Sequence, residues 1–152
     1  MKVSALLHES LEYFARLDPD SEFGFQSGRR MSYGEADRFA NRFGNALLAA
    51  GLRVGDRIGL LSKNSIEMAV MYLGASKVGV VPVPLNYRLA PAEWAWILRD
   101  SQARLLFAQD RHAPGVDSVA GDLELDLAPV VIDGRHPGWI SMIDWLAAAP
   151  DT

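Results

Sequence analysis

The sequence predicts an α/β protein: a mostly parallel sheet with helices on both faces. Two observations lead to this fold class. Short apolar runs, such as residues 57–61 and 104–108, alternate along the chain with longer segments whose apolar residues recur at helical spacing. Glycine, proline and capping residues mark the boundaries between these segments. Strands separated by helices of this length favour crossover connections, which make neighbouring strands parallel.

The beginning of the chain is expected to form a helix and a short hairpin. Ser4 can cap the helix, whose apolar residues fall on one face. Residues 22–26 and 30–33 flank the turn-forming sequence Ser27-Gly28-Arg29. Polar and apolar residues alternate in the first of these segments, so we expect two antiparallel strands joined by a tight turn.

A second helix is predicted to begin at a capping box. Ser32 and Glu35 have the required spacing, so that the hydroxyl and the carboxylate can each accept a free N–H group of the first turn. The helix is expected to end at Gly51, because glycine tolerates the left-handed conformation of a helix end. Its buried face is predicted to contain Ala36, Phe39, Ala40, Phe43, Leu47 and Leu48.

The middle of the chain is expected to form a strand, a helix and a second strand. Residues 57–61 are the first strand, and Asn64 is predicted to cap the helix. Lys77, near the end of that helix, is expected to extend towards solvent or to complement the helix C-terminus. The second strand follows Gly79, and the prolines around Val83 indicate that it is short, irregular or near an edge.

The pattern continues with one more helix and one more clear strand. Pro91 is predicted at the first helical position, with Trp94 in the core and Trp96 at the surface. After residues 104–108 the signal weakens: 111–126 reads as a helix or a loop. The last expected elements are a strand at 130–132 and a helix at 141–149 with Ile143 and Trp145 facing inward.

These elements predict a single α/β unit over residues 1–152, with its core in residues 5–110 and a less defined part in 111–152. The length fits one domain. The formal net charge of -4 leaves no basic footprint for nucleic acid. No apolar segment reaches the ~20 residues of a membrane helix. There is no cysteine and no signal-peptide pattern, so we expect a cytoplasmic protein without a membrane span.

No catalytic residue and no metal ligand stands out. The three histidines, His8, His112 and His136, lie far apart in sequence, and we expect surface or helix-end roles for them. The sequence contains no nucleophile elbow and no glycine-rich phosphate loop. Phosphate cradles need clustered glycines because backbone N–H groups converge on an anion only where side chains are absent.

The best candidate for binding is the segment Leu85 to Leu89. It follows the C-terminal end of a predicted strand, where open α/β sheets place their ligands. Asn86, Tyr87 and Arg88 offer an amide, a phenol and a guanidinium that could meet a phosphate. The alternative is structural, with Asn86 forming a turn and Arg88 pairing with an acidic residue of the next helix.

Several of these motifs, in this order, resemble the N-terminal subdomain of the AMP-forming acyl-CoA synthetases, the adenylate-forming superfamily of fatty-acid and aryl-CoA ligases. The resemblance covers roughly residues 5 to 110. It rests on Ser32-Tyr33-x-Glu35, Gly51-x-x-x-Gly55-Asp56-Arg57, Asn64-x-x-Glu67, the passage from Gly79 to Asn86, and Asp100-Ser101-x-Ala103.

The resemblance implies an ATP-dependent ligase acting in fatty acid metabolism or on related acids. A carboxylate would attack the α-phosphate of ATP, and CoA would then displace AMP. The ATP loop, the later adenylate-binding motifs and the C-terminal lid of that family are missing here. The resemblance therefore implies a fragment that is inactive alone, with ATP, Mg²⁺ and CoA as cofactors of the full-length parent. It also implies that Arg88, with Asn86 beside it, could contact a CoA phosphate.

Two other functions remain open. The chain could be a naturally short, non-catalytic module that binds a ligand or forms a homodimer through Trp96, Trp139 or Trp145. It could also be a flavodoxin-like nucleotide binder, although residues 61–65 lack the glycine or hydroxyl density of such a turn. In the fragment hypothesis the partner is the remainder of the synthetase, and the acyl substrate is not encoded in any pattern of this chain.

Overall fold

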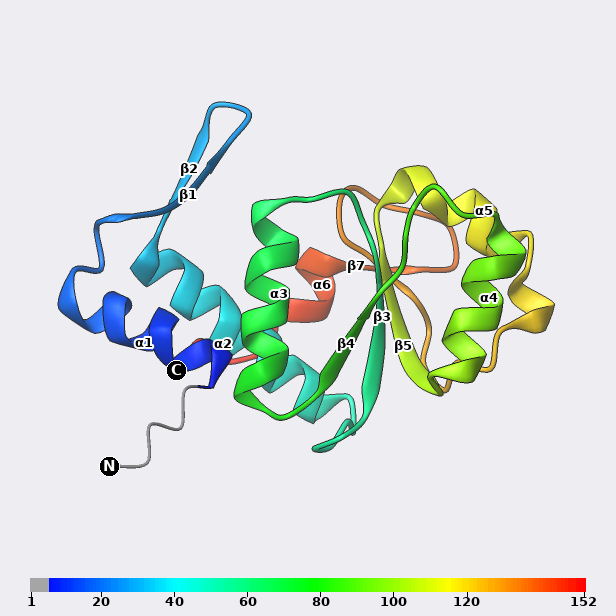
Figure 1. Ribbon diagram of the computed structural model, residues 1–152, viewed down its shortest axis with the longest axis horizontal. Helices are drawn as coiled ribbons and strands as arrows, with labels where there is room; N and C mark the ends of the chain where they lie inside the picture. The colour runs from blue at the N-terminus through cyan, green and yellow to red at the C-terminus, as the bar shows by residue number, and fades with distance from the viewer. Residues whose placement is uncertain (1–5) are drawn as a thin grey trace. The chain divides into compact units, whose positions relative to one another are not determined.

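The computed structural model describes residues 6–152, which divide into two compact units (Figure 1). Unit 1 comprises residues 6–53, 64–79 and 149–152, and unit 2 comprises 54–63 and 80–148. The predicted fold class is confirmed, since the chain is an α/β protein with a parallel sheet. The expectation of one α/β unit over residues 1–152 stays a prediction.

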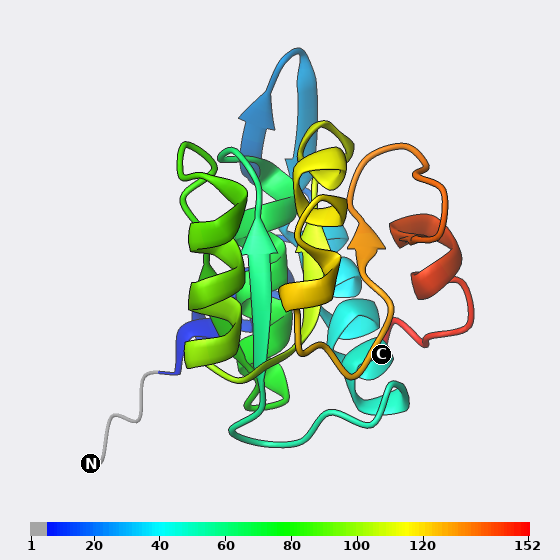
Figure 2. The ribbon, with the colours of Figure 1, turned by 90° about the vertical axis from the view of Figure 1, so that its right-hand side faces the viewer.

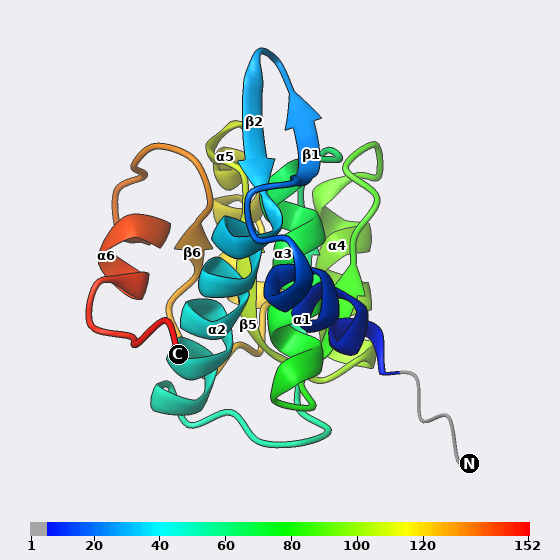
Figure 3. The ribbon, with the colours of Figure 1, turned by 90° about the vertical axis from the view of Figure 1, so that its left-hand side faces the viewer.

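Unit 1 is built on three helices, α1 (Leu7–Leu17), α2 (Tyr33–Ala49) and α3 (Ile66–Lys77), which pack against one another (Figure 3). Ser4, the predicted cap of α1, lies outside the described residues. A hairpin of two antiparallel strands, β1 (Glu22–Gln26) and β2 (Arg29–Ser32), joins α1 to α2 as predicted. The buried core of this unit is formed by Leu11, Ala36, Ala40, Ile66 and Val70.

The capping box that opens α2 is confirmed. The Ser32 hydroxyl accepts a hydrogen bond from the backbone N–H of Glu35 at 3.2 Å, and the Glu35 carboxylate accepts one from the N–H of Ser32 at 2.8 Å. This backbone N–H lowers the pKa of the Glu35 carboxyl. The helix ends before Gly51, whose φ of 85° lies in the left-handed region.

Two details of the predicted helices are wrong. Ser65, not Asn64, caps α3, because the helix begins one residue later and the Ser65 hydroxyl accepts from the N–H of Met68 at 3.1 Å. Leu48 is 49% exposed, because it lies one residue beyond the stripe of α2 that ends with buried Leu47. A local sequence signal fixes a cap only to within a residue or so.

Lys77 does not extend into solvent. Its Nζ atom lies 2.7 Å from Oε1 of Glu12 on α1 and 2.8 Å from Oδ1 of Asp37 on α2, and its side chain is only 12% exposed. One ammonium group therefore links all three helices of unit 1. Hydrogen bonding to Lys77 lowers the pKa of the Glu12 carboxyl.

Unit 2 contains a parallel sheet in the order β4-β3-β5-β6-β7. Its strands are β3 (Arg57–Leu61), β4 (Val81–Pro84), β5 (Ala103–Ala108), β6 (Val130–Val131) and β7 (Ile140–Ser141). The proline-containing strand β4 lies at one edge, as its two prolines indicated, because proline cannot donate to a second neighbour.

Helices lie on both faces of this sheet. On one face, α4 (Pro91–Asp100) and α5 (Ala113–Asp117) pack over β3 and β5 (Figure 2). The buried cluster there includes Leu61, Leu85, Trp94, Leu98, Leu106 and Val116. On the opposite face Phe107 contacts Trp145 of α6 (Met142–Leu146), with ring centroids 5.0 Å apart. Neighbouring strand residues point to opposite faces, which explains the division.

The outcomes for the aromatic and late elements are mixed. Trp94 is buried and Trp96 is 59% exposed, as predicted. The strand predicted at 130–132 forms as β6, whereas 111–126 folds into α5 and two short 3₁₀ turns, η1 (Asp110–His112) and η2 (Ala120–Asp122). The inward placement of Ile143 is wrong: α6 is only five residues long, and Ile143 is 80% exposed. Within residues 6–152, no helix has the length and apolar character to cross a membrane.

Candidate functional site

The carboxyl ends of three neighbouring strands of unit 2 meet at one edge of the sheet. After β4, the N–H of Leu85 donates to the carbonyl of Leu60 at 2.8 Å. After β5, the N–H of Gln109 donates to the carbonyl of Leu61 at 3.1 Å. The side-chain carbonyl of Gln109 in turn accepts from the N–H of Lys63 at 2.9 Å. These bonds hold the loops after β3, β4 and β5 beside one another, at the edge where open α/β sheets bind ligands.

The loop after β4 is fixed by Asn86. Its side-chain carbonyl accepts a hydrogen bond from the N–H of Arg88 at 3.0 Å, which forms a tight turn. Its backbone carbonyl accepts from Nε1 of Trp94 at 2.9 Å. Asn86 therefore has the turn-forming role that was the structural alternative, and it leaves the side chain of Arg88 available.

Arg88 forms no ion pair with any residue between 6 and 152, so the alternative that it pairs with an acidic residue of the next helix, Glu93 or Asp100, is wrong. Instead, the carboxylate of Glu93 accepts from the N–H of Ala90 at 2.8 Å, at the start of α4. The guanidinium carbon of Arg88 lies 5.7 Å from the centre of the Tyr87 ring.

Tyr87 brings two cations together. The ammonium nitrogen of Lys63 lies 5.5 Å from the centre of the same ring, within the range of a cation–π contact. Lys63 follows β3 and Arg88 follows β4, so the topology of the sheet assembles the pair. Two cations at one aromatic ring, without an ion pair between either of them and a described carboxylate, make a suitable site for a phosphate.

The buried ring of His112 packs against the Tyr87 ring. The imidazole stacks on the Tyr87 ring at 5.9 Å and meets Trp94 edge-on, also at 5.9 Å. It is 9% exposed, and its Nε2 atom has no hydrogen-bond partner among residues 6–152. Burial lowers the pKa of His112, and the nearby charges of Arg111 and Lys63 act in the same direction, against the opposing effect of Asp133. The ring is therefore neutral at physiological pH.

This burial predicts a pH dependence of stability. Because the pKa of His112 is lower in the folded chain, there is a pH range in which the unfolded chain binds a proton at His112 and the folded chain does not. The contribution of this group is thus fully present above roughly pH 6.5 and is lost as the pH falls below that value. We expect His112→Phe to reduce the loss of unfolding free energy between about pH 7 and 5, measured by urea titration at each pH. Identical slopes in the variant and the original chain would contradict this role.

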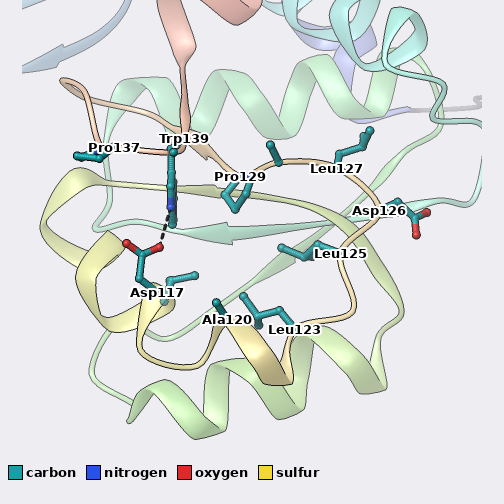
Figure 4. A pocket seen from close by; sticks show the side chains of 12 residues that line it. Asp117, Ala120, Leu123, Leu125, Asp126, Leu127, Pro129, Pro137 and Trp139 are labelled. Carbon is teal, nitrogen blue, oxygen red and sulfur yellow. Dashed lines mark hydrogen bonds between the residues drawn. The ribbon is translucent and has the colours of Figure 1, made fainter.

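Another groove of unit 2 lies elsewhere and has a volume of about 590 Å³ (Figure 4). Apolar side chains dominate its walls: Val116, Ala120, Leu123, Leu125, Leu127, Pro129, Pro137 and Trp139. The indole N–H of Trp139 donates to Asp117 at 2.9 Å, and the second oxygen of that carboxylate lies 2.6 Å from Nε2 of His136. The hydrogen bond to His136 lowers the pKa of Asp117.

The groove offers fewer free polar groups for a ligand than the carboxyl ends of the strands do. Besides Asp117, its other carboxylate, Asp126, is paired with Arg104 at 2.6 Å. Both carboxylates are therefore already engaged, and no cation lines the walls. Nor do residues 6–152 contain a group of three or more acidic or histidine side chains that could hold a metal ion. The candidate site is accordingly the cluster of Lys63, Asn86, Tyr87, Arg88 and His112, which we call the sheet-edge site.

Sequence reasoning found part of this site. It singled out Asn86, Tyr87 and Arg88 but assigned a surface or helix-end role to His112. The missed signal is that Lys63 and the turn containing His112 both follow predicted strands, as Arg88 does. Their roles as ligand contacts stay predictions.

An α/β domain with a candidate ligand site at the carboxyl edge of a parallel sheet fits many families, and comparison with known proteins identifies the family of this chain. The chain belongs to the family described as AMP-binding enzyme, whose profile matches residues 11–149. The resemblance to the adenylate-forming synthetases is thereby confirmed.

Several curated relatives are CoA ligases. The 3-hydroxybenzoate–CoA ligase of Aromatoleum sp. (strain CIB) is 41% identical over 126 residues, covering 82% of this chain and 24% of the relative. A long-chain-fatty-acid–CoA ligase of Mycobacterium tuberculosis is 34% identical over 119 residues, covering 78% of this chain and 21% of the relative. The chain thus spans about a quarter or less of the length of these proteins.

Solved structures give the same result. The anthranilate CoA ligase AuaEII, in complex with anthranoyl-AMP, matches all of this chain and 30% of its own, with a TM-score of 0.92 and 31% identity. The N-terminal domain of FACL13 from Mycobacterium tuberculosis matches 97% of this chain and 37% of its own, with a TM-score of 0.80 and 29% identity.

Proposed function

We propose that these 152 residues form the N-terminal part of an ATP-dependent acid–CoA ligase. The observation that carries the proposal is the match to CoA ligases along most of this chain but about a quarter of theirs. The reaction joins a carboxylic acid to the α-phosphate of ATP, with release of pyrophosphate. The CoA thiol then displaces AMP to give the thioester.

Within that protein, the sheet-edge site is proposed to hold a phosphate of CoA. Lys63 and Arg88 supply two cations at the Tyr87 ring, and this donor set fits a phosphate group. Asn86 holds the loop so that the backbone at Arg88 needs no rearrangement. CoA itself supplies the thiol that accepts the acyl group. The residues of the sheet-edge site bind and orient its charged end.

ATP and Mg²⁺ are proposed to bind to other parts of the longer protein. A pentavalent phosphorus requires several cations or N–H donors around it. The described part of the chain offers no metal-ligand cluster. We therefore expect the 152-residue chain alone to release no pyrophosphate from ATP.

The test is a pyrophosphate-release assay with 3-hydroxybenzoate and with palmitate, acids suggested by the names of the aryl and fatty-acid relatives. We expect release by the native protein purified from its source, and none by the 152-residue chain. Release by the short chain would contradict its inactivity. No release by a longer native protein with any carboxylic acid would contradict the ligase assignment.

Replacing Arg88 by alanine tests the CoA contact. In the native ligase we expect Arg88→Ala to raise the KM for CoA about 10-fold or more, because a hydrogen bond to a charged group contributes roughly 1.5–3 kcal/mol. The KM for ATP should change much less. Arg99→Ala is the matched control, since Arg99 is an exposed arginine on α4 of the same unit. An equal rise in the KM for CoA in both variants would show that Arg88 does not contact CoA.

A further inference from the structure

Unit 1 contains a basic pocket of about 340 Å³ between β2 and one face of α2. Its α2 residues recur at positions i, i+3, i+4 and i+7, which places them on the same side of the helix. The lining side chains are Arg29, Arg30, Met31, Glu35, Arg38, Phe39, Arg42 and Asp151. We call this cavity the arginine pocket.

The charge of the arginine pocket is opposite to that of the chain. Four guanidinium groups line it against two carboxylates, although the chain as a whole has a formal net charge of -4. One of those carboxylates, Glu35, is already engaged, since it accepts the N–H of Ser32 at 2.8 Å in the cap of α2. The pocket therefore has a local excess of positive charge.

The existing partners of these arginines are weak competitors. Arg30 lies 3.4 Å from Glu22, and both side chains are about half exposed, at 53% and 52%. Arg29 pairs with Glu67 at the start of α3. Exposed pairs of this kind contribute about 1 kcal/mol or less, so a more highly charged ligand can displace them. Arg38 forms no ion pair with any residue between 6 and 152.

The pocket already holds an oxyanion of the chain itself. Oδ2 of Asp151 lies 3.2 Å from a guanidinium nitrogen of Arg42, with side chains 45% and 39% exposed. Side chains of α2 also hold the backbone around Asp151. The Asn41 amide donates to the backbone carbonyl of Asp151 at 3.1 Å, and the Asn45 amide donates to the backbone carbonyl of Pro150 at 2.8 Å. The carboxylate is thus delivered to the pocket by its backbone, and it shows how an oxyanion contacts Arg42.

We propose that the arginine pocket is a second binding site, which takes a phosphate-bearing molecule in exchange for the Asp151 carboxylate. All four cations are arginines, whose planar forks match tetrahedral oxyanions by paired hydrogen bonds. Met31 and Phe39 add an apolar contact for the rest of the ligand. This site does not depend on the proposed ligase function, since its residues belong to unit 1 and the sheet-edge site belongs to unit 2.

The test is calorimetric titration of the 152-residue chain with inorganic pyrophosphate at low ionic strength. We expect binding that weakens about 10-fold or more in Arg38→Ala/Arg42→Ala, because two charge-assisted contacts are lost. Arg16→Ala is the control, since Arg16 is a 73% exposed arginine on α1 outside the pocket. Circular dichroism verifies that each variant is folded. No binding, or equal affinity in the double variant, would overturn the site.

Two further arms sharpen the result. Asp151→Asn removes the competing charge without touching an arginine, and we expect a several-fold tighter binding of pyrophosphate; unchanged or weaker binding would overturn the exchange. Vesicles of phosphatidylcholine with phosphatidic acid distinguish a lipid phosphate from a soluble one. Sedimentation of the chain with these vesicles, lost in the arginine double variant, would assign the ligand to a lipid headgroup. If the arginine double variant binds both the vesicles and pyrophosphate as well as the original chain does, the pocket is excluded as the binding site.

Discussion

Gly74→Ala is expected to destabilise unit 1 by about 1–3 kcal/mol, the cost of inserting a methyl group into a fully packed contact. A Cβ atom at Gly74 would lie 2.7 Å from the backbone carbonyl oxygen of Ala40 and 3.0 Å from Cδ1 of Phe43. The carbonyl belongs to the main chain of α2 and cannot turn away as a side chain would. The intrinsic preference of a helix for alanine over glycine, about 1 kcal/mol, acts in the opposite direction and is too small to compensate.

The contact is close from both sides. A Cβ atom at Gly44 on α2 would meet the carbonyl oxygen of Gly74 at 3.0 Å, so both glycines allow α2 and α3 to approach. Chemical denaturation with urea measures the effect. Gly121→Ala is the control, since no atom lies within 4 Å of the added methyl group. A Gly74→Ala variant as stable as this control would show that α2 and α3 do not approach at Gly74.

The second large effect is expected from Lys77→Met, which keeps an unbranched side chain, one atom shorter, and removes its charge. Two carboxylates, Glu12 and Asp37, then face one another without the ammonium that lies within 2.8 Å of both. We expect a loss of about 2–3 kcal/mol at neutral pH, below the 3–5 kcal/mol of fully buried pairs because the carboxylates are partly exposed.

The same substitution has a predicted pH signature. Lys77 lowers the pKa of Glu12, so the stabilisation by this carboxylate is present above its ordinary pKa of about 4.3 and is lost as the pH falls through the lower, folded value. The difference in unfolding free energy between Lys77→Met and the original chain should therefore shrink below roughly pH 4. Arg16→Ala, which removes an exposed cation 4.0 Å from the same Glu12, should cost less than about 0.5 kcal/mol. A constant difference at all pH values would contradict the ion-pair explanation.

Elements that depend on neighbouring residues could be predicted from the sequence. The capping box at Ser32, the end of α2 before Gly51 and the edge position of the proline-containing strand all follow from chemistry within a few residues. The shift of the α3 cap to Ser65 marks the limit of such signals, because adjacent Asn and Ser side chains are equally good caps.

Features that depend on distant residues could not be predicted. The partners of Lys77 lie 65 and 40 positions away in sequence, so no local pattern contains them. At the sheet-edge site, Arg88 was found because it follows a strand, whereas Lys63 and His112 join it only through the order in which β3, β4 and β5 pair. The inward placement of Ile143 failed because helical spacing gives no information on how soon a helix ends.

The central claim is that this chain is part of a longer acid–CoA ligase, and the intact mass of the native protein from its source tests it most directly. The 126 matched residues are 82% of this chain and 24% of its 3-hydroxybenzoate–CoA ligase relative, so that relative is about 3.5 times as long as the chain, and we expect a mass roughly three to four times 16.7 kDa. A native mass near 16.7 kDa would contradict the claim and would favour a short, non-catalytic binding module with the same fold.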